Sequence, residues 1–241
     1  MSKMVQYGLI IQARHNSTRL PGKVLKKIGK YTVLNMLIKR LSKLNKNYKM
    51  IVATGTNEND NKINDYLKKK KIPTFRGSNK NVLSRFFECA KINKFKNIIR
   101  ITADCPLIDS KILEKTIELF ENKNLDYASN TMPPTYPDGL DVEVFTFLAL
   151  KKAHKFAKNN HDLEHVTPYI RKNKFFKKDN LVSREDHSNL RWTLDEPRDL
   201  KFLNELDKKI DLINADYKDI LKCLKKYPYI SKINWNIARN E

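Results

Sequence analysis

The sequence has few cysteines and no long apolar segment. Its three cysteines, Cys89, Cys105 and Cys223, are widely separated and form no CxxC pair, which argues against both a disulfide framework and a zinc site. No stretch approaches the roughly 20 apolar residues that a helix needs to span a bilayer. The segment Met1–Gly8 also lacks the apolar run of a signal peptide. We therefore expect a reduced, cytoplasmic protein with no membrane partner.

Length and composition favour one folded domain. The chain has 241 residues, of which 40% are hydrophobic and 10% aromatic, so it is long enough for a sizeable core and is not wholly disordered. We see no internal repeat and no linker-like segment that would divide it. We therefore interpret residues 1–241 as a single domain.

The charge is strongly positive but has no clear pattern. The chain has 48 lysines and arginines against 27 acidic residues, a formal net charge of +21, which suggests a nucleic-acid-binding protein. The excess is nevertheless spread along the chain, and clusters such as Lys68–Lys71 fall on predicted helix ends and connections. We interpret most of this excess positive charge as solvated surface, and we expect no nucleic-acid partner. A general positive field would also attract an anionic substrate.

The first half alternates short apolar runs with helical patterns. This alternation predicts an α/β fold, a mostly parallel sheet covered by helices with ligands at the carboxyl ends of its strands. The predicted strands are Val5–Gln12, Lys49–Thr54, Pro73–Phe75 and Asn97–Thr102. The predicted helices are Val33–Leu44, Asp60–Lys70, Val82–Asn93 and Asp109–Asn122, the last capped by Asp109 or Ser110.

The second half is less regular and predicts a small β extension of the sheet. Strands are expected at Tyr127–Asn130 and Leu140–Phe147, around a proline-rich loop. The other predicted elements are helices at Phe147–Lys158, Leu163–Lys172, Pro197–Lys208 and Tyr217–Lys226, and strands near Asn180–Arg184 and Leu190–Leu194. The residues from Tyr227 onward carry little pattern, so we interpret them as a loose tail or an oligomer contact.

The most informative segment is residues 10–23, which read IIQARHNSTRLPGK. A short apolar run opens directly into a basic loop in which hydroxyl groups can donate hydrogen bonds and Pro-Gly sets a turn. A strand that ends in such a loop and then feeds a helix is how α/β proteins hold phosphate. We predict a nucleoside triphosphate here. The candidate contacts are Ala13, Arg14, Ser17, Thr18, Arg19 and Lys23.

Two carboxylates lie where predicted strands end. Asp104 follows the apolar strand that ends at Thr102, and Pro106 then forces the chain away. Asp195 follows Leu194 and precedes a proline that suits the first turn of a helix. Mg²⁺ prefers one or two carboxylates together with phosphate oxygens, so both residues are candidate metal ligands. The alternative is that either carboxylate only caps a turn or a helix.

Further polar residues are candidates for contacts with the acceptor. Asp138 lies in an Asp-Gly pair typical of a turn, and Asp141 and Glu143 follow it in position to contact acceptor hydroxyls. The run HDLEH that ends at His165 differs from HExxH, which excludes a zinc-protease interpretation. His165 is instead a candidate for lining a substrate pocket.

Two residues that follow the second and third predicted strands are candidates for nucleotide contacts. Thr54 and Arg76 both precede small, polar residues at edges where parallel sheets bind ligands. Either residue could contact the base or the ribose. Either could equally belong to an ordinary loop, and the residues alone do not decide between these interpretations.

Taken together, these residues resemble the cytidylyltransferase family, which transfers CMP from CTP to sugars and sugar acids. The segment QARHNSTRLPGK is similar to the phosphate-binding loop of that family almost position for position, closest to the spore-coat polysaccharide and CMP-Kdo synthetase branches. Other segments match in order and spacing over roughly residues 5–205. They are residues 53–57, 75–78 with 82–85, 100–106, 165–170 and 192–199.

The resemblance implies a fold, a reaction and roles for particular residues. The fold would be a three-layer α/β/α sandwich with a mostly parallel mixed sheet, close to that of nucleotide-diphospho-sugar transferases and often dimeric. Residues 1–125 would form the nucleotide-binding half and residues 126–226 the acceptor and metal half. Lys23, Arg14 and Arg19 would act on the triphosphate, while Asp104 and Asp195 would hold Mg²⁺.

The resemblance leaves the acceptor undecided. Kdo enzymes usually carry a glutamate after the metal aspartate, where this chain has Cys105. The expected partners are CTP and a small anionic or sugar acceptor, for surface glycan synthesis, in a homodimer. A glycosyltransferase that consumes a nucleotide sugar is the alternative enzyme, although no DxD metal motif is present. A basic nucleic-acid-binding protein is the third interpretation.

Overall fold

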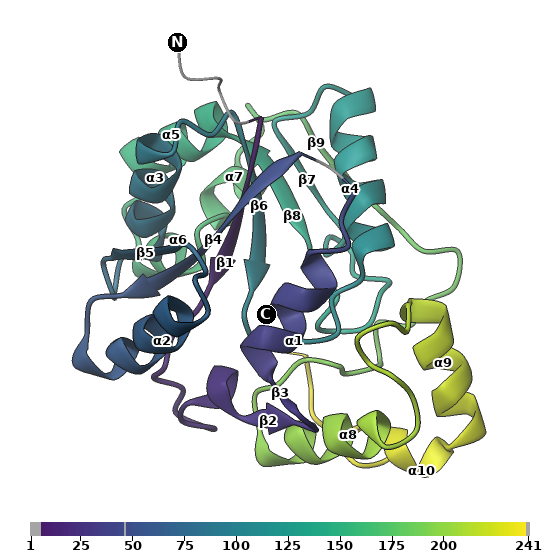
Figure 1. Ribbon diagram of the computed structural model, residues 1–241. Helices are drawn as coiled ribbons and strands as arrows, with labels where there is room; N and C mark the ends of the chain where they lie inside the picture. The colour runs from purple at the N-terminus through teal and green to yellow at the C-terminus, as the bar shows by residue number, and fades with distance from the viewer. Residues whose placement is uncertain (1–5, 46, 240–241) are drawn as a thin grey trace.

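The computed structural model describes residues 6–45 and 47–239 and is built around one seven-stranded sheet. Its strand order is β5-β4-β1-β6-β8-β7-β9 (Figure 1). The strands of the first half run parallel to one another. They are β1 (Tyr7–Gln12), β4 (Tyr48–Gly55), β5 (Thr74–Gly77) and β6 (Asn97–Thr102), close to the predicted bounds. Val5, the predicted start of the first strand, lies outside the described residues.

Three short strands extend the sheet beyond β6. The strand β8 (Glu143–Thr146) is antiparallel to β6 and to β7 (Tyr127–Ser129), and β9 (Lys178–Asn180) is parallel to β7. The sheet is therefore mixed but mostly parallel, as predicted. The predicted strand Asn180–Arg184 is wrong except at its first residue, because the chain leaves the sheet after Asn180.

Helices cover both faces of the sheet because neighbouring strand residues point to opposite sides. Leu9 and Ile11 of β1 belong to the core under α1 (Val33–Leu41), α2 (Glu58–Lys69) and α4 (Ser110–Asn122). Ile10 belongs to the opposite core, under α3 (Val82–Ile92), α5 (Phe147–Phe156) and α7 (Pro168–Lys172). This gives the predicted three layers, helices on both faces of a central sheet (Figure 1).

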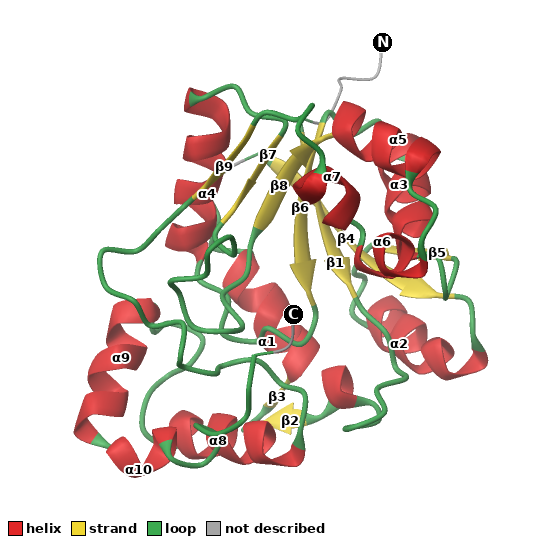
Figure 2. Ribbon diagram, turned by 180° about the vertical axis from the view of Figure 1, so that it is seen from behind, coloured by secondary structure: helices red, strands yellow, loops and turns green. Residues whose placement is uncertain are grey.

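A further core lies below the carboxyl ends of the strands. It packs the buried Trp192 against α8 (Pro197–Asp207), α9 (Tyr217–Lys226) and α10 (Pro228–Ser231). Figure 2 shows these three helices from behind. A two-stranded ribbon of β2 (Lys27–Ile28) and β3 (Tyr31–Thr32) packs against α8. The short 3₁₀ helix η1 (Lys23–Leu25) leads into it. No sequence pattern predicted this ribbon.

The single helix predicted at Leu163–Lys172 is wrong, since the structure has two. The helix α6 (Asn160–His165) ends at Val166, whose φ of 73° is not helical, and α7 begins at Pro168. The break lies at Val166 itself, because Thr167 before the proline is helical again, and Pro168 suits the first turn of the next helix. The apolar spacing continued across the break, so the pattern alone could not reveal it.

The residues from Tyr227 onward are not a loose tail. They form α10, in which Ile230 is fully buried, and continue to Asn234, which is 2% exposed. Within the described residues, no helix combines the length and apolar character needed to cross a membrane.

The predicted strand Leu190–Leu194 is also wrong, although the segment is extended. The backbone N–H of Trp192 donates to the carbonyl of Asp138 at 2.7 Å, whereas that of Leu194 donates to the carbonyl of Asp104 at 2.8 Å. The segment therefore bridges two other loops instead of joining a strand ladder. Its apolar residues face the core like those of a strand, which explains the prediction.

Gly139 lies where this bridging segment crosses the loop that carries Asp138. Its φ is +103°, and a Cβ there would lie 2.6 Å from the backbone nitrogen of Thr193. Only glycine permits both the backbone conformation and the close approach. Because Gly139 has no side chain, two loops that carry candidate site residues can pack with their backbones in direct contact.

We expect Gly139→Ala to separate these loops and to destabilise the fold by about 2 kcal/mol, which lowers Tm by roughly 4–8 °C in a chain of this size. The matched control is Gly22→Ala, because Gly22 also has a positive φ of 68° but its added Cβ would meet only the His15 side chain at 3.2 Å. Differential scanning calorimetry compares the two. An equal loss of thermal stability in both variants would show that the close contact between the two loops does not matter for stability.

Candidate active site

The loop after β1 is held by hydrogen bonds of its own backbone. The N–H of Ala13 donates to the carbonyl of Ala53 at 3.0 Å, and the N–H of His15 donates to Asp60 Oδ1 at 2.7 Å. The loop then turns back, because the N–H of Gly22 donates to the carbonyl of His15 at 3.0 Å. Gly22 adopts the left-handed conformation that precedes η1, so Lys23 is directed inward.

Lys23 lies between the two carboxylates predicted to hold a metal. Its Nζ is 2.5 Å from Asp104 Oδ2 and 2.6 Å from Asp195 Oδ1, and the residue is only 6% exposed. Three segments more than 80 residues apart therefore meet at one point. The structure brings these three predicted site residues together.

The start of α8 leaves the Asp195 carboxylate available for this contact. Asp199 Oδ2 accepts hydrogen bonds from the backbone N–H groups of Asp195 at 2.9 Å and Glu196 at 3.0 Å. Glu196 occupies the N-cap position, so Asp195 is not needed as a cap. Besides Lys23, the Asp195 side chain contacts Arg191 at 3.1 Å and Arg19 at 3.3 Å.

The pairing fixes the charges at this point. Burial alone would lower the pKa of Lys23, but Asp104 and Asp195 raise it above its ordinary value. Burial alone would raise the pKa of Asp104, but the Lys23 ammonium lowers it below its ordinary value. Lys23 and Asp104 are therefore both charged at neutral pH.

The donor set fits a cation that shares its coordination with a substrate. Among the described residues, no group of three or more histidine, cysteine, aspartate or glutamate side chains is gathered. Two carboxylates from separate segments, Asp104 and Asp195, do meet. Mg²⁺ takes one or two carboxylates and completes its shell with phosphate oxygens and water, so the residues present fit Mg²⁺.

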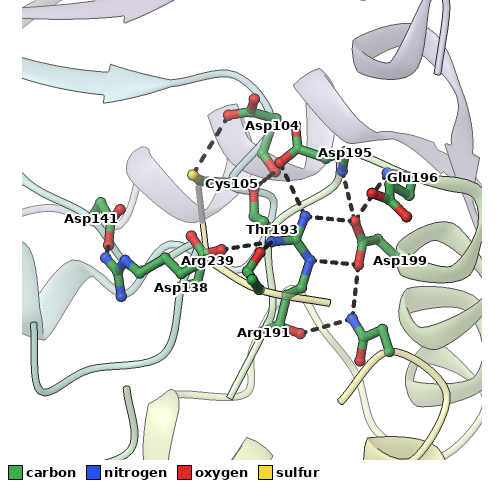
Figure 3. Close-up of polar contacts among 12 residues, drawn as sticks. Asp104, Cys105, Asp138, Asp141, Arg191, Thr193, Asp195, Glu196, Asp199 and Arg239 are labelled. Atoms are coloured by element: carbon green, nitrogen blue, oxygen red, sulfur yellow. Dashed lines mark hydrogen bonds and ion pairs between the residues drawn. The ribbon is translucent and has the colours of Figure 1, made fainter. Parts of the chain in front are cut away.

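Arg191 links these carboxylates to the predicted acceptor side. Its side chain, 2% exposed, contacts Asp138 at 2.9 Å, Asp195 at 3.1 Å and Asp199 at 3.0 Å. Figure 3 shows the guanidinium between these three carboxylates, beside Asp104 and Cys105. One buried cation therefore holds the Asp138 loop, the bridging segment and the start of α8 in fixed relation.

The predicted acceptor residues Asp138 and Asp141 lie next to each other in this network. Burial and the neighbouring charge of Asp141 raise the pKa of Asp138 to about 7. Burial also raises the pKa of Asp141, although Arg239 contacts it at 2.6 Å (Figure 3). Asp138 is buried, whereas the side chain of Asp141 is 35% exposed.

Glu143 is placed differently, in the interior of the sheet. It is 6% exposed, pairs with Arg100, and accepts hydrogen bonds from Tyr127 at 2.6 Å and Thr167 at 2.5 Å. His165 lies on α6, where its ring contacts that of His161 at a centroid distance of 4.7 Å. The structure does not bring either residue to Asp104, and their roles toward an acceptor stay predictions.

A cavity of about 540 Å³ lies on the other side of the loop that follows β1. Arg14 lines it, as do Asp60 and the 3% exposed Arg85, whose Nε has no hydrogen-bond partner among the described residues. Burial lowers the pKa of Arg85 to about 10. A buried donor without a partner beside a polar cavity indicates a place for an acceptor atom of a ligand.

The remaining predicted nucleotide contacts are spread around this loop. Thr18 is exposed, and the Oγ of Ser17 accepts a hydrogen bond from the N–H of Leu20 at 3.4 Å. Thr54 is buried with its Oγ1 unpartnered among the described residues. Arg76 donates to the carbonyls of Gly55 at 3.0 Å and Asn57 at 3.2 Å, so its guanidinium supports the loop after β4. Their roles toward a nucleotide stay predictions.

Sequence reasoning missed the residues that assemble the site. Arg191 and Asp199 lay inside an apolar strand pattern and a helix start, and Arg239 lay in a segment without pattern. A charged residue inside an otherwise buried run was the one available signal for Arg191, because buried charges need partners.

Comparisons with known proteins identify the family of the chain. A family model described as cytidylyltransferase matches residues 9–228. The chain belongs to the cytidylyltransferase family. It is 42% identical over 95% of both chains to the protein MJ1063 of Methanocaldococcus jannaschii. It is 33% identical to the spore coat polysaccharide biosynthesis protein SpsF of Bacillus subtilis, over 67% of this chain and 68% of SpsF.

Solved structures place the fold within the same family. A cytidylyltransferase from Leptospira borgpetersenii superposes with a TM-score of 0.90 at 31% identity, over 98% of this chain and 99% of that one. A CMP:2-keto-3-deoxy-manno-octonic acid synthetase complexed with CTP superposes with a TM-score of 0.65 at 14% identity, over 84% and 98% of the two chains. The fold of this cytidylyltransferase is thus that of nucleotide-diphospho-sugar transferases.

We expect Lys23→Met to destabilise the protein by about 3 kcal/mol at pH 7, because it leaves the partly buried Asp104 carboxylate without its ammonium partner and removes one of the cations that contact Asp195. Asp104 has a lowered pKa when folded, so its pairing stabilises the fold above a pH of about 4 and is lost below it. The loss of stability in the variant should therefore stay nearly constant from pH 7 to about 4 and shrink as the pH falls below about 4.

Urea unfolding at several pH values measures this difference. The matched control is Lys27→Met, at an exposed lysine in β2, which we expect to change stability by no more than about 0.5 kcal/mol. The loss in free energy of unfolding caused by Lys23→Met could be as small as that of the control, or independent of pH. Either result would show that the ammonium does not hold the carboxylates.

Proposed function

We propose that this cytidylyltransferase transfers CMP from CTP to a sugar, a sugar acid or a related phosphorylated acceptor and releases pyrophosphate. The observation that carries the proposal is the meeting of Lys23, Asp104 and Asp195 beside the loop that follows β1. It supplies, at one point, a cation for phosphate and two carboxylates for a metal. The cavity of about 540 Å³ on the other side of that loop has room for a nucleoside.

Cations of the loop would neutralise the triphosphate. Arg14 is exposed and pairs weakly with Glu164 at 3.3 Å, so its guanidinium can exchange that partner for a phosphate at small cost. Arg19 is also largely exposed and contacts Asp195. Nucleotidyl transfer needs mainly alignment and charge neutralisation, so these two arginines and Lys23 would stabilise the departing pyrophosphate.

Asp104 and Asp195 would hold Mg²⁺, and a bound Mg²⁺ would offset phosphate charge and polarise the α-phosphoryl group. Before nucleotide binds, Lys23 lowers the pKa of Asp104 and holds the carboxylates of Asp104 and Asp195 close together. The chain therefore maintains the charge state that a metal requires.

The acceptor would approach from the side of Asp138 and Asp141, where its oxygen attacks the α-phosphorus and pyrophosphate leaves. The similarity to SpsF, which is named for spore coat polysaccharide biosynthesis, supports a surface glycan as the destination. A 3-deoxy-manno-octulosonate cytidylyltransferase of Fusobacterium nucleatum, 38% identical over 50% of this chain, supports a sugar acid among the acceptors to test. We also propose that the protein forms a homodimer and acts in the cytoplasm.

Pyrophosphate release tests the proposal. We expect release with CTP and Mg²⁺ in the presence of a suitable acceptor, and no release with the other three nucleoside triphosphates. Asp104→Asn should lower kcat by at least about a hundredfold, since it weakens the site for the metal and the developing charge. Removal of Mg²⁺ with EDTA should have a similar effect.

The matched control is Asp65→Asn, at an exposed aspartate of α2 outside the site, which should keep wild-type turnover. Full activity of Asp104→Asn would remove this residue from the proposed metal site. Production of a nucleoside diphosphate from a nucleotide sugar, without pyrophosphate release from CTP, would instead establish the glycosyltransferase.

A further inference from the structure

The C-terminal segment, residues 232–239, folds back onto the acceptor side of the site. Its anchor is the buried Asn234, whose Nδ2 donates to the carbonyl of Arg191 at 3.0 Å and to Asp199 Oδ1 at 2.9 Å. Farther along, the Nη1 of Arg191 donates to the carbonyl of Ala238 at 3.2 Å.

This anchoring brings Arg239 to Asp141. The Nη2 of Arg239 is 2.6 Å from Asp141 Oδ1, and its Nη1 donates to the carbonyl of Tyr136 at 3.3 Å. In Figure 3 the pair lies beside Asp138, in the same network as Asp104 and Asp195. Arg239 therefore contacts, at Tyr136 and Asp141, the loop that we assign to the acceptor.

The ion pair of Arg239 and Asp141 is more exposed to solvent than the ion pairs of Arg191 beside it. The side chains of Arg239 and Asp141 are 21% and 35% exposed, whereas that of Arg191 is 2% exposed. On the Arg239 side of the pair, a cavity of about 290 Å³ is lined by Asp138, Arg191, Trp235 and Arg239, but not by Asp141. A guanidinium has five N–H donors, so Arg239 keeps donors beyond those used for Asp141 and Tyr136.

A carboxylate and a guanidinium held side by side present an acceptor and a donor at fixed spacing. Neighbouring hydroxyl groups of a sugar complement such a pair, because one hydroxyl can donate to the carboxylate while the next accepts from the guanidinium. The charge of Arg239 is balanced by Asp141, so uncharged hydroxyls suit the pair better than an isolated anion.

We infer that Arg239 and Asp141 bind two adjacent hydroxyl groups of a sugar acceptor, and that the C-terminal segment forms a wall of the acceptor site. The inference rests on the proposed function, since it assigns the acceptor side of that same site. It gives the segment a role in acceptor selection, separate from the binding of CTP.

Steady-state kinetics of Arg239→Ala and Arg239→Lys test this inference. Pyrophosphate release is measured with CTP, Mg²⁺ and a panel of 3-deoxy-manno-octulosonate, hexoses and hexose phosphates, each productive sugar being compared with its deoxy analogues. Lys232→Ala is the matched control, because it removes a positive charge from the same segment at an exposed position whose side chain has no hydrogen bond or ion pair among the described residues. Thermal shift by CTP is measured for every variant.

We expect Arg239→Ala to raise the KM for the sugar by roughly tenfold to a hundredfold, the loss typical of a hydrogen bond to a charged group. The KM for CTP and the thermal shift by CTP should stay at wild-type values. Arg239→Lys should recover part of the loss. Removing one hydroxyl of the sugar should weaken wild-type binding strongly but affect Arg239→Ala little, because the two changes remove the same interaction.

The outcomes separate the inference from the proposed function. Failure of CTP to stabilise the wild-type protein would overturn the proposed function itself. If CTP binds but no sugar of the panel is productive, or if Arg239→Ala and Lys232→Ala behave alike toward the sugar, the assignment of the pair is overturned while CTP binding stands. Equal rises in the KM values for CTP and for the sugar would show a structural role only.

Discussion

The site depends on the buried guanidinium of Arg191. It contacts the carboxylates of Asp138, in the loop after β7, and of Asp195 and Asp199, at the start of α8, and its side chain is 2% exposed. Carboxylates that are largely removed from water would repel one another without this cation, at a cost of several kcal/mol. The loop and the helix start can therefore approach closely because one cation contacts all three carboxylates.

Three cations share the carboxylate of Asp195, and this sharing joins the two halves of the site. Lys23 and Arg19 contact it from the loop that follows β1, and Arg191 contacts it from the bridging segment. A change in one half thus alters the charge balance in the other. Nucleotidyl transfer gains from such an arrangement, since charges that are already in place need no reorganisation when the reaction occurs.

The failures of sequence reasoning have a common physical origin. Leu190–Leu194 has the apolar pattern of a strand, yet its backbone bonds to two separate loops, because Arg191 must reach three carboxylates that no single strand partner could supply. The segment after Tyr227 has no pattern, yet Asn234 anchors it through hydrogen bonds to Arg191 and Asp199. Polar contacts with residues elsewhere in the chain determine the conformation of both segments, and hydrophobic periodicity in the sequence does not reveal such contacts.

The sequence by itself determined the alternation of strands and helices, the loop that ends at Lys23 and the strand that leads to Asp104, because local spacing and turn chemistry specify such features. Only the tertiary structure decided that Lys23 lies between Asp104 and Asp195 and that Arg239 reaches Asp141. The reason is that burying a charge is favourable only when opposite charges arrive from elsewhere in the chain, and their arrival is a property of the whole fold.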